Sequence, residues 1–392
     1  MVTAAPRARR VHPRTAVLPA HGRRHNLSLL LQTLYSAGAM SRADLARRLD
    51  LTKVTVSDLV AELLESGHAV ELGPSDEVRP GKPATLVDVN RTGLQIIGLD
   101  LAEHQTLRAA VLDLDGQILA RAERPMPDDL GTKAVHPIKE KPIEGDPVLE
   151  VVLDLTREVI ELATAPLLGI GVGTPGIVGP GGVVDTAPNL GWVDVPLREV
   201  LAAETGLPVF VSNDADAAVH ADHTLGGGGD DLMLVKVGRG VGCGLIVGGQ
   251  RVRGAHFAAG EIGHVTVGTD GGAPCRCGKD GCLETWLSAP NLERLLAEAD
   301  PVDPDRPRRE AGERLGIAIA PVVAALDLAE VVLTGPEDLL GGVLLDMLDA
   351  TLRSRMLARP STSLTVRLAR DSDDIVLRGA SVLVLWDQLG VT

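Results

Sequence analysis

Three of the chain's four cysteines lie within eight residues, and a histidine precedes them. These potential metal ligands are His264, Cys275, Cys277 and Cys282. Three thiolates and an imidazole form the closed four-coordinate shell of a structural zinc ion, whereas a catalytic zinc usually keeps a water in its shell. Gly278 and Gly281 allow the tight turns that would bring the sulfurs together. The sequence therefore predicts a structural zinc site. The alternative is three unrelated reduced cysteines, which rarely cluster with turn glycines and a nearby histidine.

The same stretch carries a resemblance to a known family. Residues 260–264 read Gly-x-x-Gly-His, residues 275–284 read Cys-x-Cys-Gly-x-x-Gly-Cys-x-Glu, and a glycine-rich segment spans residues 237–245. This pattern is similar to the signature of the ROK family, which contains sugar kinases and sugar-responsive repressors. The resemblance covers about residues 25–392. It implies a two-lobed, actin-like (ribonuclease-H-like) fold, and the alternation of expected strands and helices agrees with an α/β class.

The resemblance also implies a sugar pocket. Residues 188–192 and 212–215 resemble the family's sugar-contacting segments. The implied sugar-binding residues are Asn189, Asn213, Asp214, Glu261, His264 and Glu284. Amides and carboxylates suit sugar hydroxyls, which both donate and accept hydrogen bonds. His264 has one ring nitrogen for zinc and another for the ligand. Without the family context, Asn213 and Asp214 also fit a turn or a helix cap.

The phosphate-binding loops expected of a kinase are only partly present. In family kinases the first loop resembles Asp-x-Gly-Gly-Thr, where the missing side chains let backbone N–H groups approach phosphate. Residues 100–105 instead read Asp-Leu-Ala-Glu-His-Gln, and Glu103 would place negative charge against phosphate. The loop at residues 238–244 keeps its glycines but has Arg239 in place of the usual threonine, and residues 333–336 match in part. The sequence therefore predicts a protein that is not an enzyme and has no catalytic residues.

Residues 1–90 have the pattern of a DNA-binding head. Residues 1–24 mix Pro, Ala and Arg without periodicity, which predicts a disordered basic arm. Leucines at helical spacing over residues 27–34 predict a first helix. A capping-box-like start at residues 41–44 predicts a second helix, and apolar positions over residues 56–63 predict a third. Two helices, a tight turn and a third helix form the helix-turn-helix arrangement.

The third helix and the hairpin expected at residues 68–90 would supply the DNA contacts. The predicted contacts are Lys53, Thr55 and Ser57 in the helix, and Arg79 and Lys82 at the basic tip of the hairpin, or wing. These side-chain types reach phosphates and base edges. Asp58 either accepts from a cytosine amino group or favours the helix dipole. The alternative is a three-helix packing module that makes no DNA contact.

The charge distribution agrees with a basic head on an acidic body. The chain of 392 residues has a formal net charge of −15, of which residues 1–90 carry +3 and the remainder −18. There is no run of eighteen apolar residues, and residues 1–24 lack the apolar core of a secretory signal. Clustered cysteines fit a reducing compartment. We therefore expect a cytoplasmic protein that does not enter a membrane.

Together these features predict a sugar-responsive transcription regulator, most simply a repressor. The expected organisation is a basic arm (1–24), a winged helix-turn-helix domain (25–90) and a ROK sugar-binding domain (91–392). The lobes of that last domain are expected at about residues 93–210 plus the C-terminal helix, and at about 211–377. Expected partners are a DNA operator, a sugar and a second copy of the chain, as a dimer or a dimer of dimers. Two alternatives stay open: a sugar kinase with an accessory head, and a sugar-binding protein whose head contacts another protein.

Overall fold

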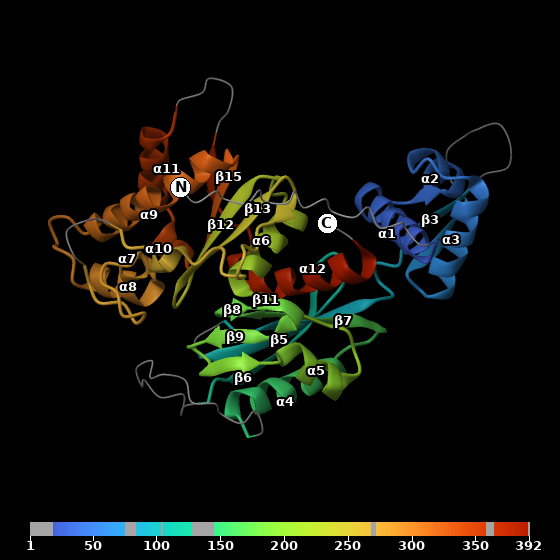
Figure 1. Cartoon of the computed structure of the whole chain (residues 1–392), viewed down its shortest axis with the longest axis horizontal. Helices are drawn as coiled ribbons and strands as arrows, with labels where there is room; N and C mark the ends of the chain where they lie inside the picture. Colours follow the sequence, from blue (N-terminus) through green and yellow to red (C-terminus); the bar gives the residue numbers. More distant parts are fainter. Residues whose placement is uncertain are drawn as a thin grey trace, which may run out of the picture. The chain divides into compact units, whose positions relative to one another are not determined.

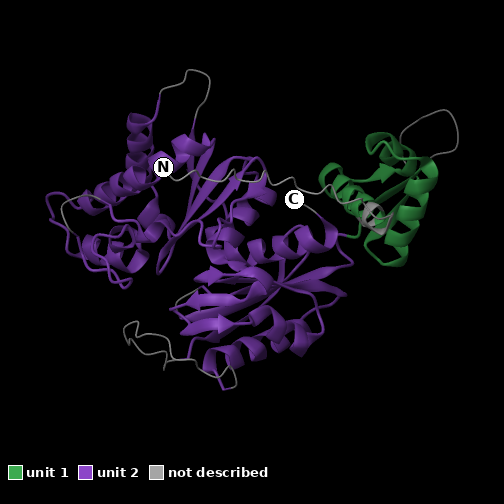
Figure 2. Cartoon of the chain, viewed as in Figure 1, with its two compact units in different colours: residues 1–90, 391 green, residues 91–390, 392 purple. Residues whose placement is uncertain are grey.

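The computed structural model describes residues 19–74, 84–102, 105–127, 145–267, 272–357 and 364–390, with the backbone alone described at residues 19–22 and 24. The described chain divides into two compact units at the junction between Asn90 and Arg91 (Figure 2). The predictions made for residues 1–18, for Glu103 and for the wing residues Arg79 and Lys82 lie outside the described residues.

The first unit contains three helices and a small antiparallel sheet. Its elements are α1 (Pro19–Ala37), β1 (Met40–Ser41), α2 (Arg42–Arg48), α3 (Lys53–Glu65), β2 (Ala69–Pro74) and β3 (Thr85–Val89). The strand order is β1-β3-β2. Ser41 caps α2 by accepting from the Asp44 N–H, and Thr52 caps α3 by accepting from the Thr55 N–H. The helices bury Leu30, Leu34, Leu45, Val56 and Leu59. The predicted helices and hairpin strands are therefore present.

The first helix begins earlier than expected. It starts at Pro19, so the prediction of disorder was wrong for residues 19–24. Proline suits the first helical turn, because its missing N–H would have no partner there. The Arg23 guanidinium also donates to Glu62 Oε2 on α3, from Nε at 2.9 Å and from Nη2 at 2.5 Å. This contact fixes the start of α1 against the third helix.

The second unit is built on two five-stranded sheets, each the centre of one lobe (Figure 1). The first sheet has the order β11-β7-β4-β5-β6. Its strands are β4 (Gln95–Asp100), β5 (Thr106–Leu112), β6 (Ile118–Pro125), β7 (Leu167–Thr174) and β11 (Val209–Asn213). The predicted antiparallel meander is confirmed by β4, β5 and β6. Strands β7 and β11 add parallel to β4.

The first lobe is completed by two helices and a small sheet. These are α4 (Pro147–Glu161), α5 (Leu197–Thr205), and the strands β8 (Ile177–Val178), β9 (Val184–Ala187) and β10 (Trp192–Val195). Helix α4 begins at the N-cap Asp146, which accepts from two backbone N–H groups and also from Trp192 Nε1 at 3.2 Å. One carboxylate thus joins the start of α4 to the strand that carries Trp192, which is 1% exposed.

The second sheet has the order β14-β13-β12-β15-β16. Its strands are β12 (Leu232–Val237), β13 (Val241–Val247), β14 (Gln250–Arg251), β15 (Glu330–Thr334) and β16 (Thr365–Leu368). Five helices belong to this lobe: α7 (Glu284–Leu287), α8 (Ala289–Ala297), α9 (Arg306–Leu326), α10 (Glu337–Leu340) and α11 (Val343–Arg355). The short helix η2 (Ile262–His264) follows β14. Strands β12 and β13 form a hairpin whose turn holds the glycine-rich loop at residues 238–240.

Two helices link the lobes. Helix α12 (Ile375–Leu389) packs on β4, β7 and β11 and against α6 (Asp214–Thr224), which itself packs on β12 and β13. These elements approach closely because of two glycines. A Cβ at Gly171 would lie 1.8 Å from the Ala380 carbonyl oxygen, and one at Gly379 would lie 1.9 Å from the Ala217 carbonyl oxygen. In the part of the chain that is described, no helix has the length and apolar character required to cross a membrane.

Candidate metal centre and ligand-binding cleft

The predicted metal ligands come together in the second lobe. Their ligand atoms, one each from His264, Cys275, Cys277 and Cys282, all lie within 4.8 Å of one another. His264 Nδ1 is 3.6 Å from Cys275 Sγ, and the sulfurs of Cys277 and Cys282 are also 3.6 Å apart. A tetrahedral zinc with Zn–S bonds of about 2.3 Å separates its sulfurs by roughly 3.8 Å. A disulfide would require about 2.05 Å. The geometry therefore fits a four-coordinate metal and excludes a disulfide in this arrangement.

Backbone turns in the cysteine segment explain this convergence. The Cys275 N–H donates to the Lys279 carbonyl at 2.8 Å, and the Gly278 N–H donates to the Cys275 carbonyl at 3.0 Å. Gly278 and Gly281 have φ values of +87° and +70°, in the left-handed region that glycine tolerates best. An isolated bridge between Thr266 and Cys282 places this turn beside the histidine segment.

The thiols of this cluster differ in their acidity. Burial, together with the neighbouring thiols, raises the pKa of Cys282 to about 12. A backbone hydrogen bond from Lys279 lowers the pKa of Cys277. Metal binding requires the three cysteines to lose their thiol protons. The three thiolates that result repel one another, and the positive charge of the metal compensates for that repulsion. The donor set thus favours a divalent cation that binds sulfur and imidazole.

Four of the six residues implied as sugar ligands converge near this centre. Asp214 starts α6, Glu284 starts α7, and Glu261 immediately precedes η2, which ends at His264. Desolvation raises the pKa of Glu261, His264 lowers it, and the Asp214 and Glu284 carboxylates raise it. Glu284 Oε2 also accepts from the Val241 N–H at 3.3 Å, beside the glycine-rich loop. The site is therefore a cluster of three carboxylates and an imidazole.

Asn213 and Asn189 are placed differently from these four. Asn213 caps α6, with Oδ1 accepting from the N–H groups of Ala215 and Asp216, and its Nδ2 donates to the Gly176 carbonyl at 2.9 Å. The cap interpretation was thus correct for Asn213. Since an asparagine amide has two N–H donors, one remains for a ligand. Asn189 is exposed in the turn after β9, without a hydrogen bond to the other five among the described residues.

The structure adds one residue that the sequence did not indicate. Lys236 at the end of β12 places Nζ 3.0 Å from Asp214 Oδ2, with the two side chains 13% and 16% exposed. Asp214 is therefore paired with a cation. The apolar sequence of β12 does not indicate this partner, because Asp214 belongs to another element, α6.

The loop that begins at Asp100 corresponds to the first phosphate-binding loop of a kinase. Its carboxylate forms hydrogen bonds to other groups of the protein. Asp100 is fully buried, and its Oδ2 accepts from Arg108 Nη2 at 2.7 Å while Oδ1 accepts from the Ala102 N–H at 2.9 Å. Burial lowers the pKa of Arg239 in the glycine-rich loop, and Arg276 lowers it further. The Asp100 carboxylate at the start of the first loop is thus hydrogen-bonded to the protein itself.

The residues predicted to contact DNA lie at the start of α3. Lys53 and Ser57 are exposed, and so is Asp58. Thr55 is half-buried, and its hydroxyl lies 2.8 Å from that of Thr52. Val54, which was not among the predicted DNA contacts, lies between Lys53 and Thr55 and is 71% exposed. An exposed apolar residue beside polar ones suits contact with a thymine methyl group.

Comparisons with known proteins agree with the fold. The ROK family description matches residues 96–386. The xylose repressor of Caldicellulosiruptor bescii is 28% identical over 399 residues, 93% of this chain and 96% of that protein. A relative from Caldicellulosiruptor sp. strain Rt8B.4 is 36% identical over 274 residues, which are 69% of this chain and 65% of that protein. The glucokinase of Halalkalibacterium halodurans is 45% identical over 135 residues, 34% of this chain and 41% of that protein.

A solved structure covers nearly the whole chain. The crystal structure of a ROK family transcriptional regulator, a homologue of the E. coli MLC protein, aligns with a TM-score of 0.78 at 23% identity, over 94% of this chain and 98% of that one. This likeness shows the fold, including a counterpart for most of both units. Because the family description matches well over half of the residues, the chain belongs to the ROK family.

Proposed function

We propose that this protein is a sugar-responsive transcription repressor. The supporting observation is that its similarity to a xylose repressor extends through both units, over 93% of this chain. Similarity to glucokinases covers less of the chain: the glucokinase of Halalkalibacterium halodurans matches 34% of it, and that of Streptomyces coelicolor matches 54%. The N-terminal unit is thus part of what the chain shares with a repressor, and kinase-like similarity belongs to the sugar-binding part.

The first unit acts as a winged helix-turn-helix head in this proposal. Helices α2 and α3 supply the helix-turn-helix, and β2 and β3 are the strands of the wing. The exposed start of α3, with Lys53, Thr55 and Ser57, enters the major groove, and Arg79 and Lys82 contact the minor groove. Two heads in a dimer would read half-sites one helical turn apart. The protein then works in the cytoplasm, where DNA and sugar are both accessible.

The second unit senses the sugar. Asp214, Glu261 and Glu284 accept hydroxyl hydrogen bonds, Asn213 donates, and Asn189 closes over the ligand when the lobes move together. His264, Cys275, Cys277 and Cys282 hold one structural zinc ion, which fixes the ring of His264 so that its other nitrogen meets the sugar. Ligand binding favours a closed arrangement of the lobes, and closure changes the spacing of the heads.

The phosphate side of the cleft supports the assignment as a non-enzyme. Transfer of phosphate needs donors that approach the triphosphate and a free base at the sugar hydroxyl. Here Asp100 pairs with Arg108, and Asp214 pairs with Lys236. A sugar kinase remains the second candidate because of the 45% identity to a glucokinase over 135 residues.

Operator binding with and without sugar tests the proposal. Duplexes selected from a randomised pool by the full chain would be used in anisotropy titrations with xylose, glucose and other common sugars. We expect one neutral sugar to weaken binding at least tenfold, equivalent to about 1.4 kcal/mol. Asp214→Asn should abolish that response while leaving sugar-free DNA binding within about twofold, since it lies outside the head. A sugar response that survives in Asp214→Asn would refute this ligand site.

Two further measurements separate the alternatives. A chain lacking residues 1–90 should lose the selected duplexes entirely, whereas a head that contacts protein would leave the selection without enrichment. Lys53→Ala should reduce the slope of log affinity against log salt by about 1, and Arg294→Ala on exposed α8 serves as the matched control. Sugar-dependent ATP consumption at rates of order 1 per second or more would instead establish the kinase.

A further inference from the structure

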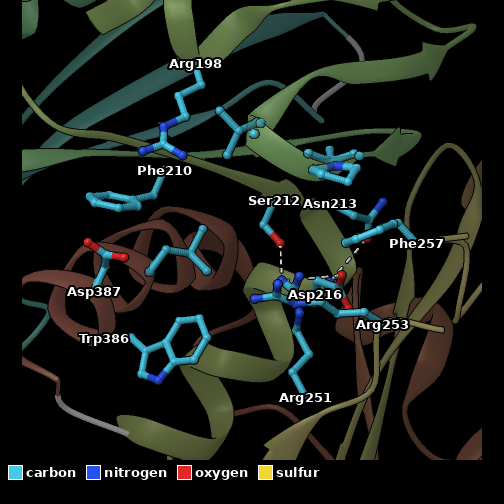
Figure 3. Close-up of a pocket in the computed structure, with 17 residues that line it drawn as sticks. Arg198, Phe210, Ser212, Asn213, Asp216, Arg251, Arg253, Phe257, Trp386 and Asp387 are labelled. Carbon is cyan, nitrogen blue, oxygen red and sulfur yellow. Dashed lines mark hydrogen bonds and ion pairs between the residues drawn. The ribbon is translucent and has the colours of Figure 1, made fainter. Parts of the chain in front are cut away.

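A cavity lies between the lobes, and most of its lining residues differ from the proposed sugar ligands (Figure 3). Its volume is about 230 Å³, and its walls include Arg198, Phe210 and Trp386 from the first lobe and α12, with Arg251 and Arg253 from the second lobe. It shares Asn213 with the proposed sugar site, whereas Asp214, Glu261, His264 and Glu284 are not among its lining residues. The cavity is therefore a separate candidate site.

Two of its arginines, Arg198 and Arg253, lie beside aromatic rings. The Arg198 guanidinium lies 5.9 Å from the ring centroid of Phe210, and that of Arg253 lies 5.7 Å from the ring centroid of Trp386. Neither forms an ion pair with any residue that the structure describes. A cation–π contact holds a guanidinium beside the ring, while the N–H groups in the plane of the guanidinium remain available to a ligand.

The third arginine belongs to a buried polar cluster that is only partly satisfied. Arg251 Nη1 donates to Ser212 Oγ at 2.7 Å and lies 3.6 Å from Asp216 Oδ2. Asp216 is 9% exposed, and within the described structure its Oδ1 and the Arg251 Nε are buried without a hydrogen-bond partner. Unsatisfied buried polar atoms are costly and rare, so they point to a bound polar molecule.

We propose that this cavity binds a small organic anion of monosaccharide size, a sugar acid or a sugar phosphate. The guanidinium groups of Arg198, Arg251 and Arg253 hold its carboxylate or phosphate, because forked N–H groups match such oxygens. The carboxylates of Asp216 and Asp387 accept from its hydroxyls, and the aromatic rings cover its apolar face. The volume lies below the roughly 300–1,000 Å³ of sites for drug-sized ligands, which limits the ligand to this size.

The charges separate this cavity from the sugar cleft. Three arginines and two aspartates line the cavity. The cleft instead combines Asp214, Glu261 and Glu284 with the single cation Lys236. An anion is thus attracted to the cavity and repelled from the cleft, and a neutral sugar has the opposite preference.

Occupation of the cavity would act on the same lobe movement as the sugar. Arg251 on β14 of the second lobe already bonds to Ser212 on β11 of the first lobe, and an anion between Arg198 and Arg253 adds a second bridge across the lobes. Two ligands that favour the same arrangement of the lobes increase each other's affinity, and the effect is reciprocal. The protein would then respond jointly to a neutral sugar and to an anionic metabolite.

Calorimetry on the full chain tests the proposal with glucuronate, glucose 6-phosphate, inorganic phosphate and glucose as probes. We expect one of the two organic anions to bind the wild type at least tenfold more tightly than inorganic phosphate does. Arg253→Gln and Arg198→Gln should each weaken that binding about tenfold, as expected for the loss of a charge-assisted hydrogen bond. Arg294→Gln, on exposed α8, and Asp214→Asn, in the sugar cleft, should leave it within about twofold.

Four outcomes would overturn the proposal. The first is no heat from either organic anion up to about 10 mM, far beyond a useful affinity. The second is equal binding by wild type, Arg253→Gln and Arg198→Gln. The third is loss of anion binding in Asp214→Asn, which would place the anion in the sugar cleft. The fourth is a change of oligomeric state in Arg253→Gln by sedimentation, which would make this surface a subunit interface. Each readout is independent of DNA binding, so a failure here leaves the repressor assignment to its own test.

Discussion

The two sides of the cleft differ in what their polar groups bond to. On the metal side, four ligand atoms lie within 4.8 Å of one another, and the Asp214 and Glu284 carboxylates are near enough to raise the pKa of Glu261. On the phosphate side, the Asp100 carboxylate pairs with the Arg108 guanidinium of the protein. A group already bonded to protein gains little from a ligand, because it exchanges one partner for another. In the function proposed above, the cleft keeps sugar recognition and loses phosphate transfer, and the side chain that pairs with Asp100 accounts for part of that difference.

The largest expected effect is on the metal side of the cleft. Cys277→Ser should release the metal and disorder the segment around residues 261–284, because structural zinc contributes on the order of 10 kcal/mol of coupled folding energy. Cys277 is exposed, so the substitution itself disturbs little packing. Metal analysis and thermal unfolding give the readout. Cys243→Ala, which changes the buried cysteine outside the cluster, is the control and should keep one metal per chain. Equal metal content and stability in Cys277→Ser and wild type would contradict the assignment of a structural metal site.

On the phosphate side, the expected loss is smaller. Asp100→Asn removes the charge of a fully buried carboxylate that accepts from Arg108 at 2.7 Å. Removing one partner of a buried ion pair costs about 3–5 kcal/mol. Asp115→Asn, at an exposed ion pair with Arg91, should cost less than about 1 kcal/mol. Urea unfolding of both variants measures the difference. If Asp100→Asn were as stable as Asp115→Asn and gained MgATP binding, the carboxylate would be serving a ligand and not the fold.

The sequence predicts those parts of the cleft in which the interacting residues lie close together along the chain. The four metal ligands lie within residues 264–282, and local turns at Gly278 and Gly281 suffice to bring them together. Three helices of the first unit follow from apolar spacing and from the caps at Ser41 and Thr52. Local patterns were therefore sufficient for the metal cluster and for the elements of the head.

Pairs that depend on tertiary structure were not predictable. Lys236 meets Asp214 only because β12 and α6 pack together, and Arg251 meets Ser212 across the lobes. The start of α1 at Pro19 was missed because residues 19–24 have no apolar periodicity, and the contact from Arg23 to Glu62 involves another helix. The amide of Asn213 shows the same limit, since whether it caps a helix or binds sugar depends on geometry that its sequence context leaves open.

Asp216, a buried carboxylate of α6, should make the stability of the protein depend on pH. Burial raises the pKa of Asp216 from 3.8 to about 6, with Arg251 opposing the shift. The folded state then binds a proton that the unfolded state has released, so stability falls as pH rises from about 4 to about 6, by on the order of 2–3 kcal/mol. Asp216→Asn should lack this fall. Urea unfolding from pH 4.5 to 7.5 measures it.

The difference between wild type and Asp216→Asn isolates this one group. Burial lowers the pKa of His220 to about 3, which makes stability rise with pH over the same range. Metal release also depends on pH. Both effects are common to the two proteins and cancel in the difference. A pH-independent difference would show that Asp216 titrates normally and that its burial is compensated.

The smallest expected effect falls on Lys236, where the two sides of the cleft meet. Lys236→Met keeps much of the side-chain length but removes the ammonium 3.0 Å from the Asp214 carboxylate. Asp214 then loses its charged partner in a half-buried site, which should cost about 1–2 kcal/mol of folding stability. The freed carboxylate should accept a sugar hydroxyl more readily, so affinity for the neutral sugar should rise, by less than about tenfold. No phosphorylation should appear, because Asp100 still pairs with Arg108 and the first loop still lacks its glycines. Calorimetry with the sugar and a coupled assay with MgATP measure the two parts, with Arg294→Met as the control. ATP-dependent turnover in Lys236→Met would show that one ion pair alone separates this repressor-like cleft from a kinase.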